Sequence, residues 1–214
     1  MQPSRLSDRD KIEIGATVLT FRRLQTEASQ IPRTAASVNA TVADVRKVNC
    51  WLMVADIAGS TQMAHKLKPE ESANLTGAWL ANCKKIVESN HGMINKFLGD
   101  GFFAYWLDKP GLEAAILKAL NELKALQQKS APPFRVVLHC GMATSGGAPT
   151  LGEESLSGRE VNFVFRMEEL ASSLGNLLLL SPAAADRLRG FSPVISEGAH
   201  HVADFDGQYQ FFSL

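Results

Sequence analysis

The chain lacks an excess of charge of either sign. Its 214 residues carry 22 Lys and Arg against 22 Asp and Glu, a formal net charge of 0. Proteins that bind nucleic acid carry a basic excess or patch, so this composition argues against that class. No apolar run reaches the length of a membrane span, and the N-terminus has no apolar signal segment. The sequence predicts a soluble protein with no nucleic-acid partner and no membrane insertion.

Cysteine is also scarce. Cys50, Cys83 and Cys140 are odd in number and have neither CxxC nor Cys/His ligand spacing. This pattern predicts reduced, buried thiols in a cytoplasmic protein, and it argues against structural zinc. Hydrophobic residues make up 45% of the chain, enough for one sizeable core and an appendage.

The appendage is expected at the N-terminus. Alternating apolar residues predict a hairpin within residues 1–23, and a mixed polar stretch containing Pro32 predicts a partly helical linker over 24–48. A lone hairpin is marginally stable in water, so this one needs a partner surface. Residues 6–15 resemble the last strands of a forkhead-associated (FHA) domain, although Arg9 replaces a glycine of that pattern. The hairpin is therefore interpreted as a remnant of an upstream domain.

Residues 49–214 alternate between strand and helix patterns. A nearly unbroken apolar run from Cys50 ends in Asp56, as a strand buried on both faces does, and Gly99-Asp100-Gly101 forms a hairpin-turn signal. The order β-α-β-β-α-β predicts an α+β, ferredoxin-like core with an extra helix and a C-terminal β-hairpin. The predicted elements are strands at 50–56, 93–98, 101–106, 134–140 and 177–180, helices at 69–90, 110–128, 158–174 and 182–189, a loop at 141–157, and a hairpin at 200–214.

Two acids mark one edge of this predicted sheet. Asp56 and Asp100 end or cap strands that are expected to be neighbours, and two close carboxylates are unfavourable without a cation. Oxygen ligands without His or Cys favour Mg²⁺ or Mn²⁺ over zinc. The small residues 57–61 follow Asp56 at a helix N-terminus, where backbone amides bind anions. Together these features predict a metal–polyphosphate site.

Three further polar residues complete the candidate set. Lys96 lies in the strand before Asp100, and Asn162 and Arg166 are spaced i, i+4 on one helix face. A guanidinium suits a phosphate or a developing oxyanion. Each side chain also has a plain structural interpretation, such as a helix cap for Asp56 or a solvated helix arginine for Arg166.

Three motifs in order resemble the catalytic domain of class III adenylate/guanylate cyclases. Trp51-Leu-Met-Val-Ala-Asp-Ile-Ala-Gly-Ser-Thr61 resembles F-A-D-I-x-G-[SF]-T, and Lys96-Phe-Leu-Gly-Asp-Gly101 resembles K-x-x-G-D-[GC]. Ser155-Leu-Ser-Gly-Arg-Glu-Val-Asn-Phe-Val-Phe-Arg166 resembles [DT]-x-x-G-x-x-V-N-x-A-x-R. The resemblance covers about residues 49–214.

The resemblance implies conversion of ATP to 3′,5′-cyclic AMP and pyrophosphate, with two Mg²⁺ or Mn²⁺ ions per active site. It also implies a homodimer with two composite sites, in which metal-binding and base-reading residues come from opposite subunits. The implied roles are metal binding for Asp56, Ile57 and Asp100; phosphate binding for Gly59, Ser60 and Thr61; adenine recognition for Lys96 and Ser155; ribose positioning for Asn162; and stabilisation of the α-phosphate for Arg166.

The sequence departs from the family pattern at two places. Ser155 replaces the usual aspartate or threonine, and a hydroxyl that both donates and accepts discriminates less sharply between bases. No lysine follows Lys129, although the family's C-terminal hairpin usually supplies one to the triphosphate. Lysine at position 96 favours ATP, whereas Ser155 keeps a guanylate cyclase open. A catalytically weak nucleotide-binding regulatory module is the other alternative.

Overall fold

A computed structural model describes residues 10–14, 17–20, 46–129, 132–146 and 156–214. Contacts divide the chain into two units, Met1–Thr41 and Val42–Leu214. In the first unit, strands β1 (Lys11–Ile14) and β2 (Thr17–Thr20) pair antiparallel, with Lys11 opposite Thr20. The paired strands agree with the predicted hairpin, and its relation to an FHA domain stays a prediction.

The second unit is built on one mixed sheet. Strands β4, β5, β3 and β6 lie side by side in that order, and β8, β10 and β9 extend the sheet beyond β6. Helices α2 and α3 follow β3 and β5 in the chain, which gives the predicted ferredoxin-like order. The strands are β3 (Arg46–Ile57), β4 (Met93–Phe97), β5 (Gly101–Leu107), β6 (Phe134–Ser145), β7 (Leu156–Ser157), β8 (Leu178–Leu180), β9 (Ile195–His200) and β10 (Tyr209–Ser213).

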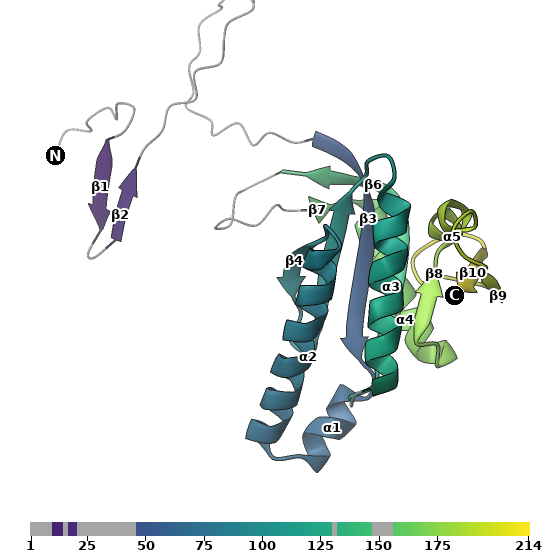
Figure 1. Cartoon of the computed structure of the whole chain (residues 1–214), viewed down its shortest axis with the longest axis horizontal. Coiled ribbons are helices and arrows are strands. Elements are labelled where there is room, and N and C mark those ends of the chain that lie inside the picture. The colour runs from purple at the N-terminus through teal and green to yellow at the C-terminus, as the bar shows by residue number, and fades with distance from the viewer. Residues whose placement is uncertain (1–9, 15–16, 21–45, 130–131, 147–155) are drawn as a thin grey trace, which may run out of the picture. The chain divides into compact units, whose positions relative to one another are not determined.

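Helices cover both faces of the sheet. One core lies between the sheet and helices α2 (Pro69–Ser89), α3 (Leu112–Lys129) and α5 (Pro182–Leu188), and Figure 1 shows α2 and α3 side by side over the strands. A second core lies between the opposite face and α4 (Arg159–Leu174). The short helix α1 (Ser60–Lys66) follows β3.

Strand β3 explains why the sheet needs cover on both faces. Trp51, Met53 and Ala55 point into the first core, whereas Cys50, Leu52 and Val54 point into the second. Alternation of two apolar sets along one strand is what a central strand requires. The three tryptophans, Trp51, Trp79 and Trp106, are all buried, as expected for core packing rather than base stacking.

Three predicted boundaries were wrong. Strand β6 continues to Ser145, so part of the expected 141–157 loop is a strand opposite the start of β3. β3 in turn begins at Arg46, inside the expected linker, and the C-terminal hairpin begins at Ile195 rather than near His200. Backbone pairing, rather than side-chain burial, stabilises these strand ends. Their sequences are therefore polar or irregular and do not show the apolar pattern by which a strand is recognised.

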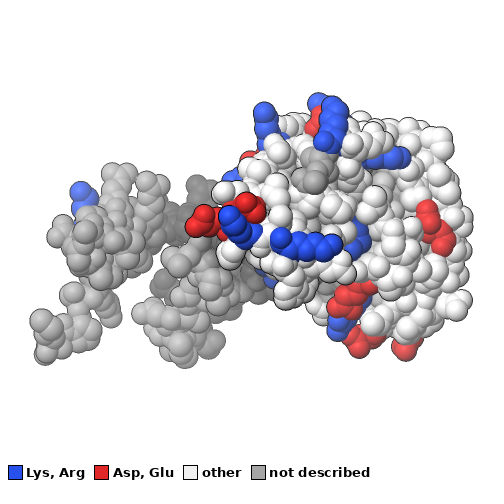
Figure 2. Space-filling view, turned by 90° about the horizontal axis from the view of Figure 1, so that it is seen from below, with Lys and Arg blue, Asp and Glu red and all other residues white. Residues whose placement is uncertain are grey.

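The surface carries both signs of charge. Figure 2 shows Lys and Arg side chains interspersed with Asp and Glu on the face in view. In the part of the chain that the structure describes, no helix combines the length and apolar character needed to cross a bilayer.

Candidate active site

The two predicted metal-binding acids lie together at one end of the central strands. Asp56 is the last residue but one of β3 and pairs with Gly101, the residue after Asp100, on β5. The Ile57 N–H donates to the Asp100 carbonyl at 3.2 Å, which ties the hairpin turn to the end of β3. The predicted neighbourhood of these two acids is therefore present.

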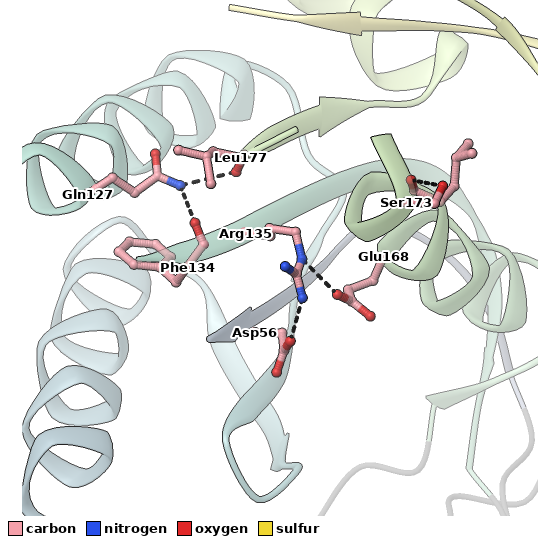
Figure 3. A network of polar contacts seen from close by, with 8 residues as sticks. Asp56, Gln127, Phe134, Arg135, Glu168, Ser173 and Leu177 are labelled. Atoms are coloured by element: carbon pink, nitrogen blue, oxygen red, sulfur yellow. Dashed lines mark hydrogen bonds and ion pairs between the residues drawn. The ribbon is translucent and has the colours of Figure 1, made fainter. Parts of the chain in front are cut away.

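An arginine that sequence reasoning missed lies beside Asp56. Arg135 is the register partner of Asp56 on β6, and its Nη2 lies 3.0 Å from Asp56 Oδ2. Its Nε donates to Glu168 Oε1 of α4 at 3.2 Å. Figure 3 shows Arg135 reaching between the two carboxylates, which come from β3 and α4. Four charged groups, Asp56 of β3, Asp100 of the turn between β4 and β5, Arg135 of β6 and Glu168 of α4, thus form the metal-side cluster.

Electrostatics in this cluster favour a bound cation. Burial first, and then the neighbouring charges of Asp100 and Glu168, raise the pKa of Asp56 from 3.8 to about 6, although Arg135 acts to lower it. Burial and two like charges outweigh one guanidinium here, because the guanidinium is shared with Glu168. A divalent cation near Asp56 and Asp100 would offset this repulsion directly.

The turn of small residues after Asp56 has fewer backbone amides available for an anion than the sequence predicts. The amides of Ile57 and Ala58 donate to the carbonyls of Asp100 and Pro133, at 3.2 and 2.8 Å. Gly59 then adopts a left-handed conformation, φ 72°, as the residue before α1. The first amides of a helix have no acceptor within the helix. The amides left for phosphate therefore belong to Gly59, Ser60 and Thr61.

Lys96, Asn162 and Arg166 lie in or beside one groove. Asn162 and Arg166 of α4 line a groove of about 740 Å³, together with Phe165. Lys96 is exposed on β4, and its Nζ lies 5.7 Å from the centre of the Phe165 ring. The structure thus places Lys96 beside the groove that holds Asn162 and Arg166. We call these three residues the base-side set.

Arg166 already has two partners in this groove. Its Nη1 lies 2.6 Å from Glu169 Oε1, and its Nη2 lies 2.5 Å from Asp204 Oδ2. Asp204 belongs to the loop between β9 and β10 and has a left-handed backbone, φ 65°. Sequence reasoning did not single out Asp204, and its position in a loop gives no pattern that points to α4.

Ser155 lies outside the described residues, so its predicted contact with adenine stays a prediction. Of the other predicted site residues, Asp56 and Asp100 belong to the metal-side cluster, and Lys96, Asn162 and Arg166 form the base-side set. Ile57 ends β3, and the phosphate-binding candidates Gly59, Ser60 and Thr61 lie in the turn that follows and at the start of α1. Sequence reasoning overlooked Arg135 because it follows Phe134 at the start of an apolar run, where charged residues are common at the ends of strands. A signal was present, since an arginine in a strand that pairs with a metal-binding strand needs an anionic partner.

Comparison with solved structures identifies the fold. The crystal structure of the adenylyl cyclase CyaB from P. aeruginosa superimposes with a TM-score of 0.68 and 23% identity, over 79% of this chain and 94% of that one. The guanylate cyclase domain of RhGC from Catenaria anguillulae, in complex with GTP, gives a TM-score of 0.67 and 14% identity, over 78% and 96%.

Sequence comparison adds relatives but no activity. No protein-family model matches the chain. An uncharacterized protein of Mycobacterium tuberculosis is 31% identical over 154 residues, which are 68% of this chain and 28% of that protein. The chain thus spans little more than a quarter of the length of this curated relative. The structural comparisons support one conclusion, that residues from β3 onward have the α+β fold of the adenylyl and guanylyl cyclase catalytic domains.

Proposed function

We propose that this chain is a class III adenylate cyclase, which converts ATP to 3′,5′-cyclic AMP and pyrophosphate. One observation carries the proposal: Asp56 and Asp100 lie together at the end of β3, in a domain with the cyclase fold. A nucleotide cyclase needs paired carboxylates that recruit a divalent metal to a triphosphate. The preference for ATP rests on Lys96.

The acids fit Mg²⁺ or Mn²⁺ bound together with substrate. Within the described residues, no three His, Cys, Asp or Glu side chains gather as a metal site by themselves. Mg²⁺ is commonly held by one or two carboxylates plus substrate phosphates, so Asp56 and Asp100 suffice, with the Ile57 carbonyl as a further oxygen. Two bound metal ions would lower the pKa of the substrate 3′-hydroxyl and offset charge on the leaving pyrophosphate.

The protein's own residues would bind and orient the nucleotide. The amides of Gly59, Ser60 and Thr61 would donate to phosphate oxygens, because they stand at a helix start directly after the metal-binding strand. Arg135 pairs directly with Asp56 and would contribute positive charge to the triphosphate. This arginine offers a substitute for the lysine that the C-terminal hairpin lacks.

The base-side set would act on the substrate of the opposite site. Lys96 and Ser155 would contact the adenine, Asn162 would position the ribose, and Arg166 would stabilise charge on the α-phosphate. No residue of the metal-side cluster lines the groove of Asn162 and Arg166, which supports two composite sites in a homodimer. Arg166 would have to exchange Asp204 for substrate, since its guanidinium is already paired.

The decisive experiment is a turnover assay with Mn²⁺ and ATP, with cyclic AMP quantified by mass spectrometry. Asp100→Ala should reduce turnover at least about 100-fold, because removing one metal ligand disables the electrostatic step. Asp206→Ala is a matched control, since Asp206 is exposed and belongs to neither site set. Equal cyclic AMP production by Asp100→Ala and the parent chain would refute the proposal.

The same assay with GTP separates adenylate from guanylate cyclase. Lys96 predicts a higher kcat/KM for ATP, and a preference for GTP would move the assignment to a guanylate cyclase. Binding of nucleotide without turnover in either case would favour the regulatory alternative.

A further inference from the structure

A second cavity lies outside both site sets. Its volume is about 240 Å³, and it lies among β6, the first turns of α4 and α5, and the segment that leads into β10. Residues that line it include His139, Glu160, Phe163, Ala183, Phe205 and Tyr209. None of these six residues has a role in the proposed reaction.

Aromatic rings form most of its wall. The Phe163 ring lies 4.9 Å from Phe205, 5.0 Å from Tyr209 and 5.0 Å from His139, measured between ring centres. Phe163 and Phe205 are both buried, whereas Tyr209 is half-buried. Rings at these separations offer edges and faces to a further flat ring. The wall therefore suits a planar aromatic ligand.

One end of the cavity is polar and fixed in place. His139 Nδ1 lies 2.8 Å from Ser181 Oγ, and its Nε2 lies 2.7 Å from Glu160 Oε2. Ser181 Oγ in turn accepts from the Ala184 amide. All these groups are satisfied when Ser181 donates to Nδ1 and Nε2–H donates to Glu160. His139 thus holds Glu160 in position.

Gly141 makes this arrangement possible. A Cβ atom at residue 141 would lie 2.8 Å from His139 Nε2 and 2.8 Å from Glu160 Cγ. Both distances are too short for real contacts, so a side chain here would push Glu160 and His139 apart. The glycine is a local requirement of the polar end.

Glu160 leaves an acceptor for a ligand. The contact with His139 lowers the pKa of Glu160, so the carboxylate is anionic near neutral pH. Only Oε2 is occupied by His139, and among the described residues no hydrogen bond reaches Oε1. A charged acceptor in a mostly aromatic cavity selects an N–H donor.

We propose that this cavity binds a small planar heterocycle with an N–H donor, packed against the rings of Phe163 and Phe205 and hydrogen-bonded to Glu160. The size supports one or two fused rings. An apolar cavity of about 150 Å³ holds benzene, whereas drug-sized ligands need about 300 Å³ or more. By the same comparison of volumes, the cavity is too small for a whole nucleoside triphosphate.

The cavity shares a wall with the groove of Arg166. Arg159 and Phe205 line both spaces, and the Arg159 guanidinium lies 5.3 Å from the centre of the Phe205 ring. Asp204, which pairs with Arg166, is the residue before Phe205. A ligand that moves Phe205 would also move Asp204 and so alter its contact with Arg166. Any resulting change in turnover rests on the proposed function, whereas binding of a ligand to the cavity does not.

The test uses benzimidazole and its isostere indene, which lacks the N–H group and the second ring nitrogen, in ligand-observed NMR titrations of the full chain. Benzimidazole should bind with Kd below about 1 mM, and indene at least about tenfold more weakly. Ala183→Leu places a larger side chain in the cavity from an exposed helix position. It should raise the Kd for benzimidazole at least about tenfold. Ala114→Leu, the same change at an exposed position of α3, should leave the Kd unchanged.

Glu160→Gln should remove most of the difference between the two probes while preserving shape. Absence of saturable benzimidazole binding up to about 5 mM would overturn the proposal, as would equal binding by Ala183→Leu and Ala114→Leu. The titration is repeated with Asp100→Ala. Binding there should equal that of the parent chain, so a failure of the proposed reaction and a failure of this cavity are distinguishable.

Discussion

Arg135 donates to Asp56 across a β-ladder, with 3.0 Å between Nη2 and Oδ2 of two residues that are paired in register on β6 and β3. The same guanidinium binds Glu168, which lies two residues after Arg166 on α4. One arginine therefore joins the strand of the metal-side cluster to the helix that carries the base-side set. This connection lies within one chain, whereas the two sets serve different sites of the proposed dimer.

Arg135→Lys keeps the charge but removes the planar fork that reaches both acids. We expect kcat/KM for ATP to fall at least about tenfold, because a shared, charge-assisted contact contributes roughly 1.5–3 kcal/mol. Steady-state kinetics with Mn²⁺ measure this change. Arg189→Lys is the control, since Arg189 forms an exposed pair with Asp186. Equal losses in both variants would contradict a specific role for Arg135.

Asp56→Asn should stabilise the metal-free protein near neutral pH. The pKa of Asp56 rises from 3.8 to about 6 on folding, so the folded state binds more protons than the unfolded state between these values. The free energy of unfolding therefore falls as pH rises through this window, and the penalty persists above it. Asparagine has no charge to desolvate but still accepts from Arg135.

Thermal unfolding of both proteins at several pH values tests this sign. The Tm of Asp56→Asn should exceed that of the parent near pH 7.5, and the gap should narrow towards about pH 4. Mn²⁺ should raise the Tm of the parent more than that of the variant. A parent Tm above that of Asp56→Asn near pH 7.5, with the parent losing this advantage on acidification, would show that Arg135, rather than Asp100 and burial, dominates the environment of Asp56.

Strong patterns of apolar residues made most of the second unit predictable from sequence. The apolar run ending at Asp56, the Gly-Asp-Gly turn and the amphipathic pattern of α4 each determine a local structure that burial reinforces. Asp56 and Asp100 were brought together by reasoning from strand order, because sheet neighbours place their ends at one edge. Local pattern and tertiary packing agree in these elements.

The missed features depend on contacts between distant segments. Arg135 and Asp56 are far apart in sequence, and only the β3–β6 register brings them within hydrogen-bond distance. Asp204 reaches Arg166 through the position of a loop, which no periodicity encodes. The same holds for Glu160 and His139, whose contact requires a glycine at residue 141, two residues after His139 on β6.

Asp204→Asn should favour substrate binding at Arg166. Asp204 is exposed and its charge both occupies the guanidinium and repels a triphosphate. We expect KM for ATP to fall roughly two- to tenfold with little change in kcat, since an exposed ion pair is weak and removing a charge that repels the triphosphate adds to the gain. Asp206→Asn, an exposed acid on the same loop, should leave KM unchanged. An increase in KM for Asp204→Asn would mean that Asp204 orients Arg166 for catalysis.

Complementation between two inactive chains tests whether the active sites are shared. Asp100→Ala removes an acid of the metal-side cluster, and Arg166→Ala removes a residue of the base-side set. Each variant alone should lose at least about 100-fold in turnover. In a mixed dimer, one site receives both defects and the other receives neither. Mixing equal amounts should therefore restore about a quarter of the parent activity, because half of the dimers are mixed and each has one intact site.

Mixing Asp100→Ala with Asp56→Ala is the matched control, since both changes fall in the same set and no intact site can form. Activity that stays at background in the first mixture, with mixed dimers verified by native mass spectrometry, would place both sets in one chain's own site.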